Sequence, residues 1–175
     1  IPSYATELSQ GKDRSDKFAT SVFNLLIAML LFIVLVIEIF MPFFVYLIAP
    51  GFDGDSPTMG IAINLTRITF PFLLFISLAS FFSAILNSHN RFAIASAAPI
   101  ILNILLIGVL FFGKLLNDQL VYYLAYAVTI SGIIQLIFLY IFVKKFYLPR
   151  LTFKIEIDEK VKNFFKRLLP SIFSS

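Results

Sequence analysis

Four long apolar stretches constrain the fold of this 175-residue chain more than any other feature. They cover residues 22–48, 61–86, 93–112 and 120–143, and between them lie the polar, turn-forming segments "APGFDGDSP", "NSHNR" and "GKLLNDQ". About 20 apolar residues in a helix cross a bilayer, and an open sheet edge cannot satisfy its backbone hydrogen bonds in lipid. The sequence therefore predicts an all-α, polytopic membrane helical bundle, with four full transmembrane helices and partial helices at both ends.

The composition agrees with a lipid environment and excludes several functional classes. Hydrophobic residues make up 59% of the chain and charged residues only 14%, against about 25% charged in an ordinary globular domain. The chain has no cysteine and a single histidine, His89, which excludes thiolate chemistry and a histidine metal cluster. It also contains no glycine-rich nucleotide loop and no hydrolase elbow. We therefore expect no enzymatic activity, no cofactor and no metal.

Basic residues predict the orientation of the helices. Three precede the first stretch, Arg91 lies between the second and the third, and eight follow the fourth. The other two loops together hold one lysine, Lys114, and three aspartates. Because cytoplasmic loops are enriched in Lys and Arg, we expect the N-terminal end, the Arg91 loop and the C-terminal tail in the cytoplasm. The net charge of +4 is then a topology signal, and we expect no nucleic-acid partner.

The two ends of the chain suggest that it is a fragment of something longer, because it begins at Ile1 and stops within the pattern "LLPSIFSS". We expect residues 1–146 to form the transmembrane part and residues 147–160 a cytoplasmic linker. Residues 161–175 have apolar side chains at helical spacing, which predicts the amphipathic start of a further transmembrane helix. A helix lying on anionic lipid headgroups is the alternative for that segment.

Two charged residues lie within the apolar stretches, where a charge costs at least a few kcal/mol. Glu38 is near the middle of the first stretch, and Arg67 is about two turns from the outer end of the second. The two helices are neighbours through a short outer loop, and the length of an arginine side chain would allow an ion pair. The alternatives are a protonated Glu38 and an Arg67 that reaches the outer interface.

Uncharged polar residues extend this candidate cavity site. Asn64 lies one turn before Arg67, while Asn103 and Gln135 lie in the third and fourth stretches. The amides of Asn103 and Gln135 either line a polar cavity or form hydrogen bonds between helices. We take Glu38, Asn64, Arg67, Asn103 and Gln135 as the candidate set.

Prolines are the second unusual feature of the apolar stretches. Pro42, Pro71 and Pro99 each lie within one, where a proline removes a backbone hydrogen bond and bends the helix. Three bent helices indicate a central cavity, as in alternating-access transporters. The alternative is the ordinary proline content of membrane helices.

The run "LTRITFPFLLFISLASFFSAILNSHNRFAIASAAPIILNI" closely resembles the MurJ/MviN family of bacterial lipid II flippases. The segments "IPSYATE", "APGF" and "LLPSI" resemble it in the same order and spacing. This family belongs to the superfamily of multidrug, oligosaccharidyl-lipid and polysaccharide exporters. The resemblance implies two six-helix lobes around a cavity, with this chain covering the end of the second family helix to the start of the seventh.

The resemblance also implies an activity and a location. Family members move lipid-linked peptidoglycan precursor from the cytoplasmic to the outer leaflet of the bacterial inner membrane, driven by membrane potential or a coupling ion. The arginines with which the family holds the diphosphate lie mainly in its first two helices and its eighth, so none of them is expected here. Arg67 stands where the family often has a basic residue, which implies a supporting role. Glu38 matches no family hallmark.

Three other functions stay open from the sequence. One is a non-transporting scaffold, which the charges of Glu38 and Arg67 within the spans argue against only weakly. A drug or cation antiporter of the same superfamily would use Glu38 as its proton- or cation-linked acid. A membrane enzyme acting on polyprenyl-phosphate substrates would need clustered acids at a membrane face. Asp53 and Asp55 are the only nearby pair, and turn formation explains them more simply.

Overall fold

The computed structural model describes residues 2–49, 51, 57–113 and 119–150. These residues form seven helices and no strand: α1 (Pro2–Ser9), α2 (Lys12–Ile39), α3 (Met41–Ile48), α4 (Pro57–Thr69), α5 (Phe72–Ser88), α6 (Phe92–Phe112) and α7 (Leu120–Val143). Four helical stretches are long and apolar enough to cross a membrane: α2, α4 together with α5, α6, and α7. The predicted all-α bundle with four spans is therefore confirmed.

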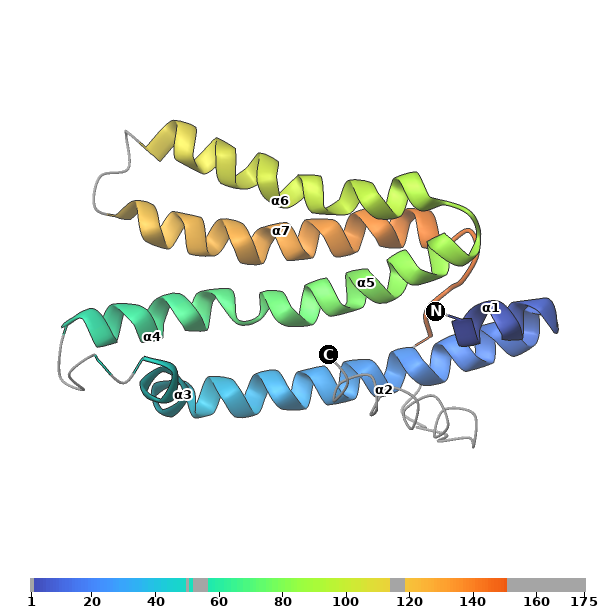
Figure 1. Ribbon diagram of the computed structural model, residues 1–175, viewed down its shortest axis with the longest axis horizontal. Helices are drawn as coiled ribbons and strands as arrows, with labels where there is room; N and C mark the ends of the chain where they lie inside the picture. The colour runs from blue at the N-terminus through green and yellow to red at the C-terminus, as the bar shows by residue number, and fades with distance from the viewer. Residues whose placement is uncertain (1, 50, 52–56, 114–118, 151–175) are drawn as a thin grey trace.

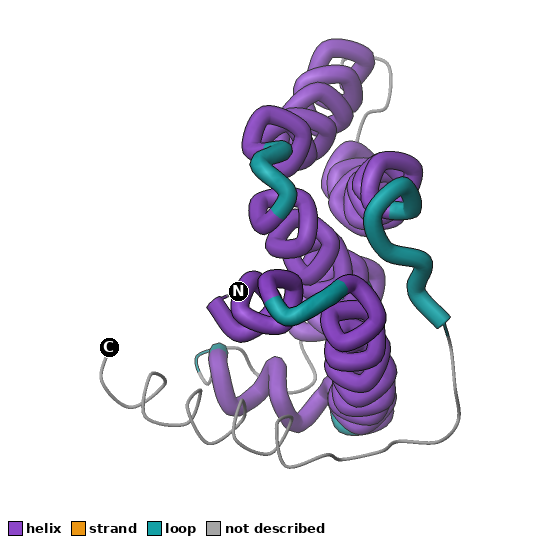
Figure 2. Tube along the Cα trace, turned by 90° about the vertical axis from the view of Figure 1, so that its right-hand side faces the viewer, coloured by secondary structure: helices purple, strands orange, loops and turns teal. Residues whose placement is uncertain are grey.

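The helices run alongside one another, with α6 at one edge of the bundle and α2 at the other (Figure 1). Between them lie α7, which packs against α4, α5 and α6, and α5, which packs against α2. Figure 2 shows the same order from the end of the bundle. The main core lies where α2, α5 and α7 meet, and the rings of Phe23, Phe81 and Phe82 pack together there.

Large apolar side chains outside the core remain exposed. Phe32 on α2 is 67% exposed and Phe111 on α6 is 78% exposed. Exposed apolar area of this extent would cause aggregation in water, whereas lipid chains solvate it without cost. The surface of the bundle is thus consistent with a multi-pass membrane protein.

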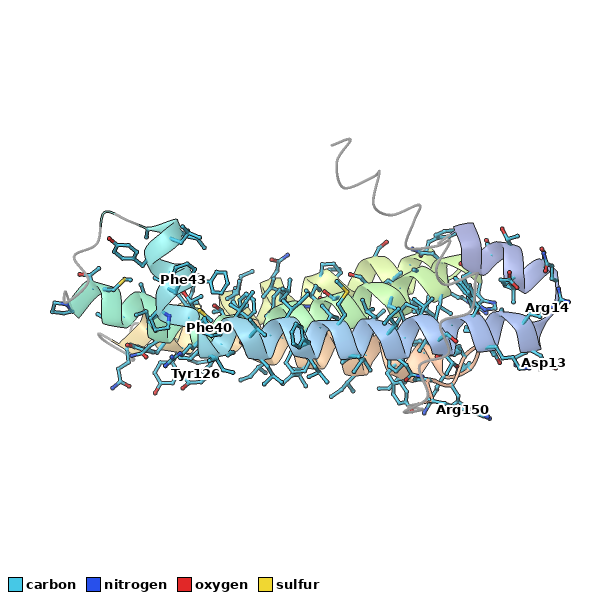
Figure 3. All side chains as sticks on the ribbon, turned by 90° about the horizontal axis from the view of Figure 1, so that it is seen from below. Asp13, Arg14, Phe40, Phe43, Tyr126 and Arg150 are labelled. Atoms are coloured by element: carbon cyan, nitrogen blue, oxygen red, sulfur yellow. The ribbon has the colours of Figure 1, made fainter. Side chains whose placement is uncertain are left out.

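The basic segments lie together at one end of the bundle. This end contains α1, the start of α2, the α5–α6 turn and the end of α7 (Figure 1). The turn is tight because Asn90 adopts φ 58° and the backbone N–H of Arg91 donates to the carbonyl of Leu86 at 2.9 Å. Arg14 and Arg150 are at the same end in Figure 3, which agrees with the alternation of basic residues along the sequence.

Single cysteines in this cysteine-free chain test the orientation. Thr58, at the start of α4, and Asn87, at the end of α5, are both exposed. We expect Thr58→Cys to react with an impermeant maleimide in intact spheroplasts and Asn87→Cys to react only after permeabilisation. The reverse labelling pattern would invert the orientation.

The predicted bounds of the first span are wrong. The spanning helix α2 begins at Lys12 and ends at Ile39, and the chain then turns at Phe40 (φ −97°, ψ 20°) into α3. Pro42 has no N–H to donate to the carbonyl of Glu38, so one helical hydrogen bond is lost where the chain turns into α3. Figure 3 shows α3 leaving the axis of α2 at Phe40, with Phe43 in its first turn.

The other two prolines differ from each other in their effect. The second span is divided into α4 and α5 at Phe70 and Pro71. By contrast, Pro99 lies inside α6, which runs from Phe92 to Phe112 as one helix. The prolines thus coincide with helix ends at two places, and α6 shows no comparable interruption.

Candidate substrate-binding site

Both helix breaks border one small apolar cluster. Met41 and Val45 from α3 pack with Met59 from α4, and all three are buried. Ile37, at the end of α2, and Phe70, at the α4–α5 break, pack against the same cluster. Glu38 follows Ile37 directly and Arg67 lies three residues before Phe70, so both charged residues belong to segments that border this cluster.

Glu38 and Arg67 are the charged residues of this region. Glu38 is partly buried, and its Oε1 atom has no hydrogen-bond partner among the described residues. Arg67 is exposed on α4 and carries the opposite charge. The two groups nevertheless form no ion pair within 4.0 Å in the described part of the chain. The direct ion pair anticipated from the sequence is therefore absent.

The other candidate amides are not all in this region. Asn64 is exposed one turn before Arg67, so the two side chains share a face of α4. Asn103 is exposed on α6, which packs against α7 and α5 at the far edge of the bundle from α2. Gln135 is 1% exposed on α7, and neither polar atom of its amide has a partner among the described residues. The structure thus groups Glu38, Asn64 and Arg67 and leaves the other two apart.

A polar and aromatic cluster at the basic end of the bundle was not anticipated from the sequence. The Tyr4 hydroxyl lies 3.3 Å from His89 Nε2, and the His89 ring stacks on Phe146 at 4.5 Å with an interplanar angle of 19°. The Arg91 guanidinium lies 5.9 Å from the centre of the Phe146 ring. These contacts join α1, the α5–α6 turn and the segment after α7. The sequence features that could have indicated this cluster are the lone histidine in a turn and the aromatic residues after "KK".

Tyr147 anchors the same end of the bundle. Its side chain is 1% exposed, donates to Thr20 Oγ1 at 3.2 Å and meets the Phe81 ring edge-on. Burial raises the pKa of Tyr147 to about 12. Burial also lowers the pKa of His89, although the nearby charge of Asp16 opposes that shift. Both groups are therefore held neutral, and the cluster works as a packed junction.

Acid should weaken this junction. The pKa of His89 is lower in the folded chain than its ordinary value of 6.5, so the unfolded state takes up the proton more readily. The stability that neutral His89 contributes is present above pH 6.5 and is lost as the pH falls through the folded-state pKa. We expect the melting temperature in detergent to drop by a few degrees as the pH falls from 6.5 through the folded-state pKa of His89. His89→Gln, which removes the only histidine, should abolish the His89-dependent part of the drop, and an unchanged pH profile would contradict the assignment.

The fold is that of a multi-pass helical membrane protein, and proline sites coincide with breaks in two of its apolar segments. The family model described as lipid II flippase MurJ matches residues 1–175, so the chain belongs to this family.

Individual relatives agree with the family model. The chain is 36% identical over 149 residues to the probable lipid II flippase MurJ of Rhizobium tropici, covering 82% of the chain and 28% of that relative. It is also 36% identical over 146 residues to the probable lipid II flippase MurJ of Rickettsia prowazekii, covering 83% of the chain and 28% of the relative. The lipid II flippase MurJ of Burkholderia cenocepacia is 35% identical over 91 residues, which are 52% of the chain and 18% of that protein. The chain thus spans less than a third of the length of these relatives.

Proposed function

We propose that this chain is part of a transporter that moves lipid II from the cytoplasmic to the outer leaflet of the bacterial inner membrane by alternating access. The observation that carries the proposal is the match of the lipid II flippase family model to residues 1–175. Transport of this kind needs no covalent chemistry. It needs polar groups that replace the lost hydration of a charged headgroup, while the polyprenyl tail stays in lipid.

The grouped polar side chains support a role in such a path. Arg67 and Asn64 present a cation and an amide on one exposed face of α4, within an otherwise apolar span. The Arg67 cation attracts a diphosphate, and the diphosphate oxygens can accept hydrogen bonds from Arg67 and Asn64. We assign them a supporting contact with the headgroup. Membrane potential or a coupling ion would drive the cycle, at about 2.3 kcal/mol per charge per 100 mV.

We propose the same division of the chain as the sequence suggested. Residues 1–146 would correspond to the end of the second family helix through the sixth. Residues 147–160 would form the cytoplasmic linker, and residues 161–175 the start of the next helix. Residues 151–175 lie outside the described part of the chain.

One observation favours a second candidate, a drug or cation antiporter. The Glu38 carboxylate has a buried oxygen without a partner, as a proton- or cation-linked acid would require. A transport assay on a reconstituted full-length family member that contains this sequence distinguishes the flippase from the antiporter. We expect this protein to move fluorescent lipid II to the outer leaflet, where an impermeant quencher reaches it. Excess cationic drug should leave the rate of this movement unchanged. Drug-driven proton release without lipid II movement would favour the antiporter. The aspartates considered for a lipid-processing enzyme, Asp53 and Asp55, lie outside the described residues.

A further inference from the structure

The break between α4 and α5 leaves backbone carbonyls without their usual helical partners. In a continuous helix the N–H of Leu73 would donate to Thr69, but here it donates to Phe70 at 3.0 Å. Pro71 has no N–H at all. The last turn of α4 therefore ends with acceptors that another group has to satisfy.

A side chain from α7 satisfies one of these acceptors. The hydroxyl of Thr129 donates to the backbone carbonyl of Ile68, which is 61 residues away in the sequence. The hydroxyls of Thr66 and Thr69 on α4 instead donate within their own helix, to Ala62 at 2.8 Å and to Leu65 at 3.0 Å. Thr129 thus links α7 to the α4 side of the break.

Gly132, almost one turn further along α7, meets the α5 side of the break. A Cβ atom on Gly132 would lie 2.7 Å from Cδ2 of the Phe72 ring and 3.0 Å from Cβ of Phe75. Because real side chains do not approach so closely, only glycine lets the first turn of α5 sit against the backbone of α7. One face of α7 therefore holds both halves of the divided helix.

We propose that Thr129 and Gly132 are positioning residues that set the angle between α4 and α5. The angle decides where Asn64 and Arg67 lie, because α4 carries both. The 13 residues of α4 span about 20 Å, so a change of about 20° in the bend moves its outer end by about 7 Å. The importance of this displacement for transport rests on the proposed function, whereas the angle itself does not.

Spin-label distances in the 175-residue chain, placed in lipid nanodiscs, test the proposal. Ile61 on α4 and Val121 on α7, both about half exposed, report the outer ends of the two helices. Asn87 and Lys144, both exposed, report the inner ends of α5 and α7 as a control pair. Because the chain has no cysteine, each pair can be labelled without background.

Thr129→Val removes the hydroxyl and keeps the shape of the side chain. We expect it to shift or broaden the outer distance by several ångströms and to leave the inner distance unchanged. Thr129→Ser keeps the donor and should restore the original outer distance. Thr69→Val makes the same chemical change in a hydroxyl that bonds within α4, and it should leave both distances unchanged.

Three results would overturn the proposal. They are an unchanged outer distance in Thr129→Val, an equal shift in Thr69→Val, and no rescue by Thr129→Ser. If Thr129→Val does not fold, Gly132→Ala serves instead: it must displace Phe72 and Phe75 and shift the outer distance, and an unchanged distance would refute the assignment. These measurements use no substrate, so their failure is distinct from failure of the proposed function. A shifted distance with normal lipid II flipping would remove the link to transport.

Discussion

Arg67→Ala should reduce lipid II flipping by about tenfold in a full-length family member that carries this sequence. Arg67 is an exposed cation on α4, one turn from Asn64, in a span whose other side chains are mostly apolar. A tenfold loss corresponds to about 1.4 kcal/mol, a reasonable size for one charge-assisted contact to a phosphate. Arg67→Lys keeps the charge and should retain more activity than Arg67→Ala. The measurement is the rate at which labelled lipid II becomes accessible outside proteoliposomes.

The matched control is Arg14→Ala. Arg14 is also exposed, but it bonds the Gln10 side chain at 2.9 Å at the basic end of the bundle. We expect this change to leave flipping within about twofold of the original rate, as is usual for surface substitutions away from a site. Equal losses in both variants would indicate a general effect of net charge and would remove Arg67 from the path.

The relation between Glu38 and Arg67 can be measured in the same assay. Because Glu38 and Arg67 carry opposite charges without direct contact, we expect a coupling energy of about 0.5–1 kcal/mol from a double-mutant cycle of alanine substitutions. The double variant should therefore lose somewhat less than the sum of the single losses. Zero coupling would leave Arg67 as a side chain that reaches the outer interface alone.

The number of spans could be predicted from the sequence because apolar length is a local property. The ends of the spans could not. Residues 12–21 read as a polar lead-in, yet they form the first turns of α2, where Ser15, Phe18 and Ala19 are buried. Phe18 and Ala19 belong to a core that includes side chains of α5 and α7, and the sequence of α2 alone does not identify those partners.

The candidate site was only partly predictable for the same reason. Counting residues from the outer ends of the helices places Glu38 and Arg67 close enough in depth for an arginine side chain to reach. Contact also depends on helix rotation and on the turn at Phe40. Tyr4 and His89 are 85 residues apart, and Tyr147 and Thr20 are 127 apart, so no local pattern links them. Proline predicted where backbone hydrogen bonds would be lost, but the helix ended at only two of the three prolines.

The 175-residue chain by itself should not flip lipid II in vesicles. Taking a charged headgroup through hydrocarbon without a polar path costs several kcal/mol per charge even after relaxation. Among the described residues, Arg67 is the one cation that lies within an apolar span and away from the basic end of the bundle, and a diphosphate carries more than one negative charge. The chain also covers only 28% of relatives such as that of Rhizobium tropici. The expected rate is that of protein-free vesicles.

Proteoliposomes that contain the full-length protein at an equal protein-to-lipid ratio are the positive control. A melting curve of the 175-residue chain serves as the control for its folding. Each span in the chain has an apolar face directed away from the core, as the exposed side chains of α2 and α6 illustrate. A closed path needs polar surfaces on both sides, and Asn64 and Arg67 provide only one. Flipping by the folded chain at the full-length rate would therefore mean that α2 to α7 enclose a complete path, which would refute the two-lobe arrangement.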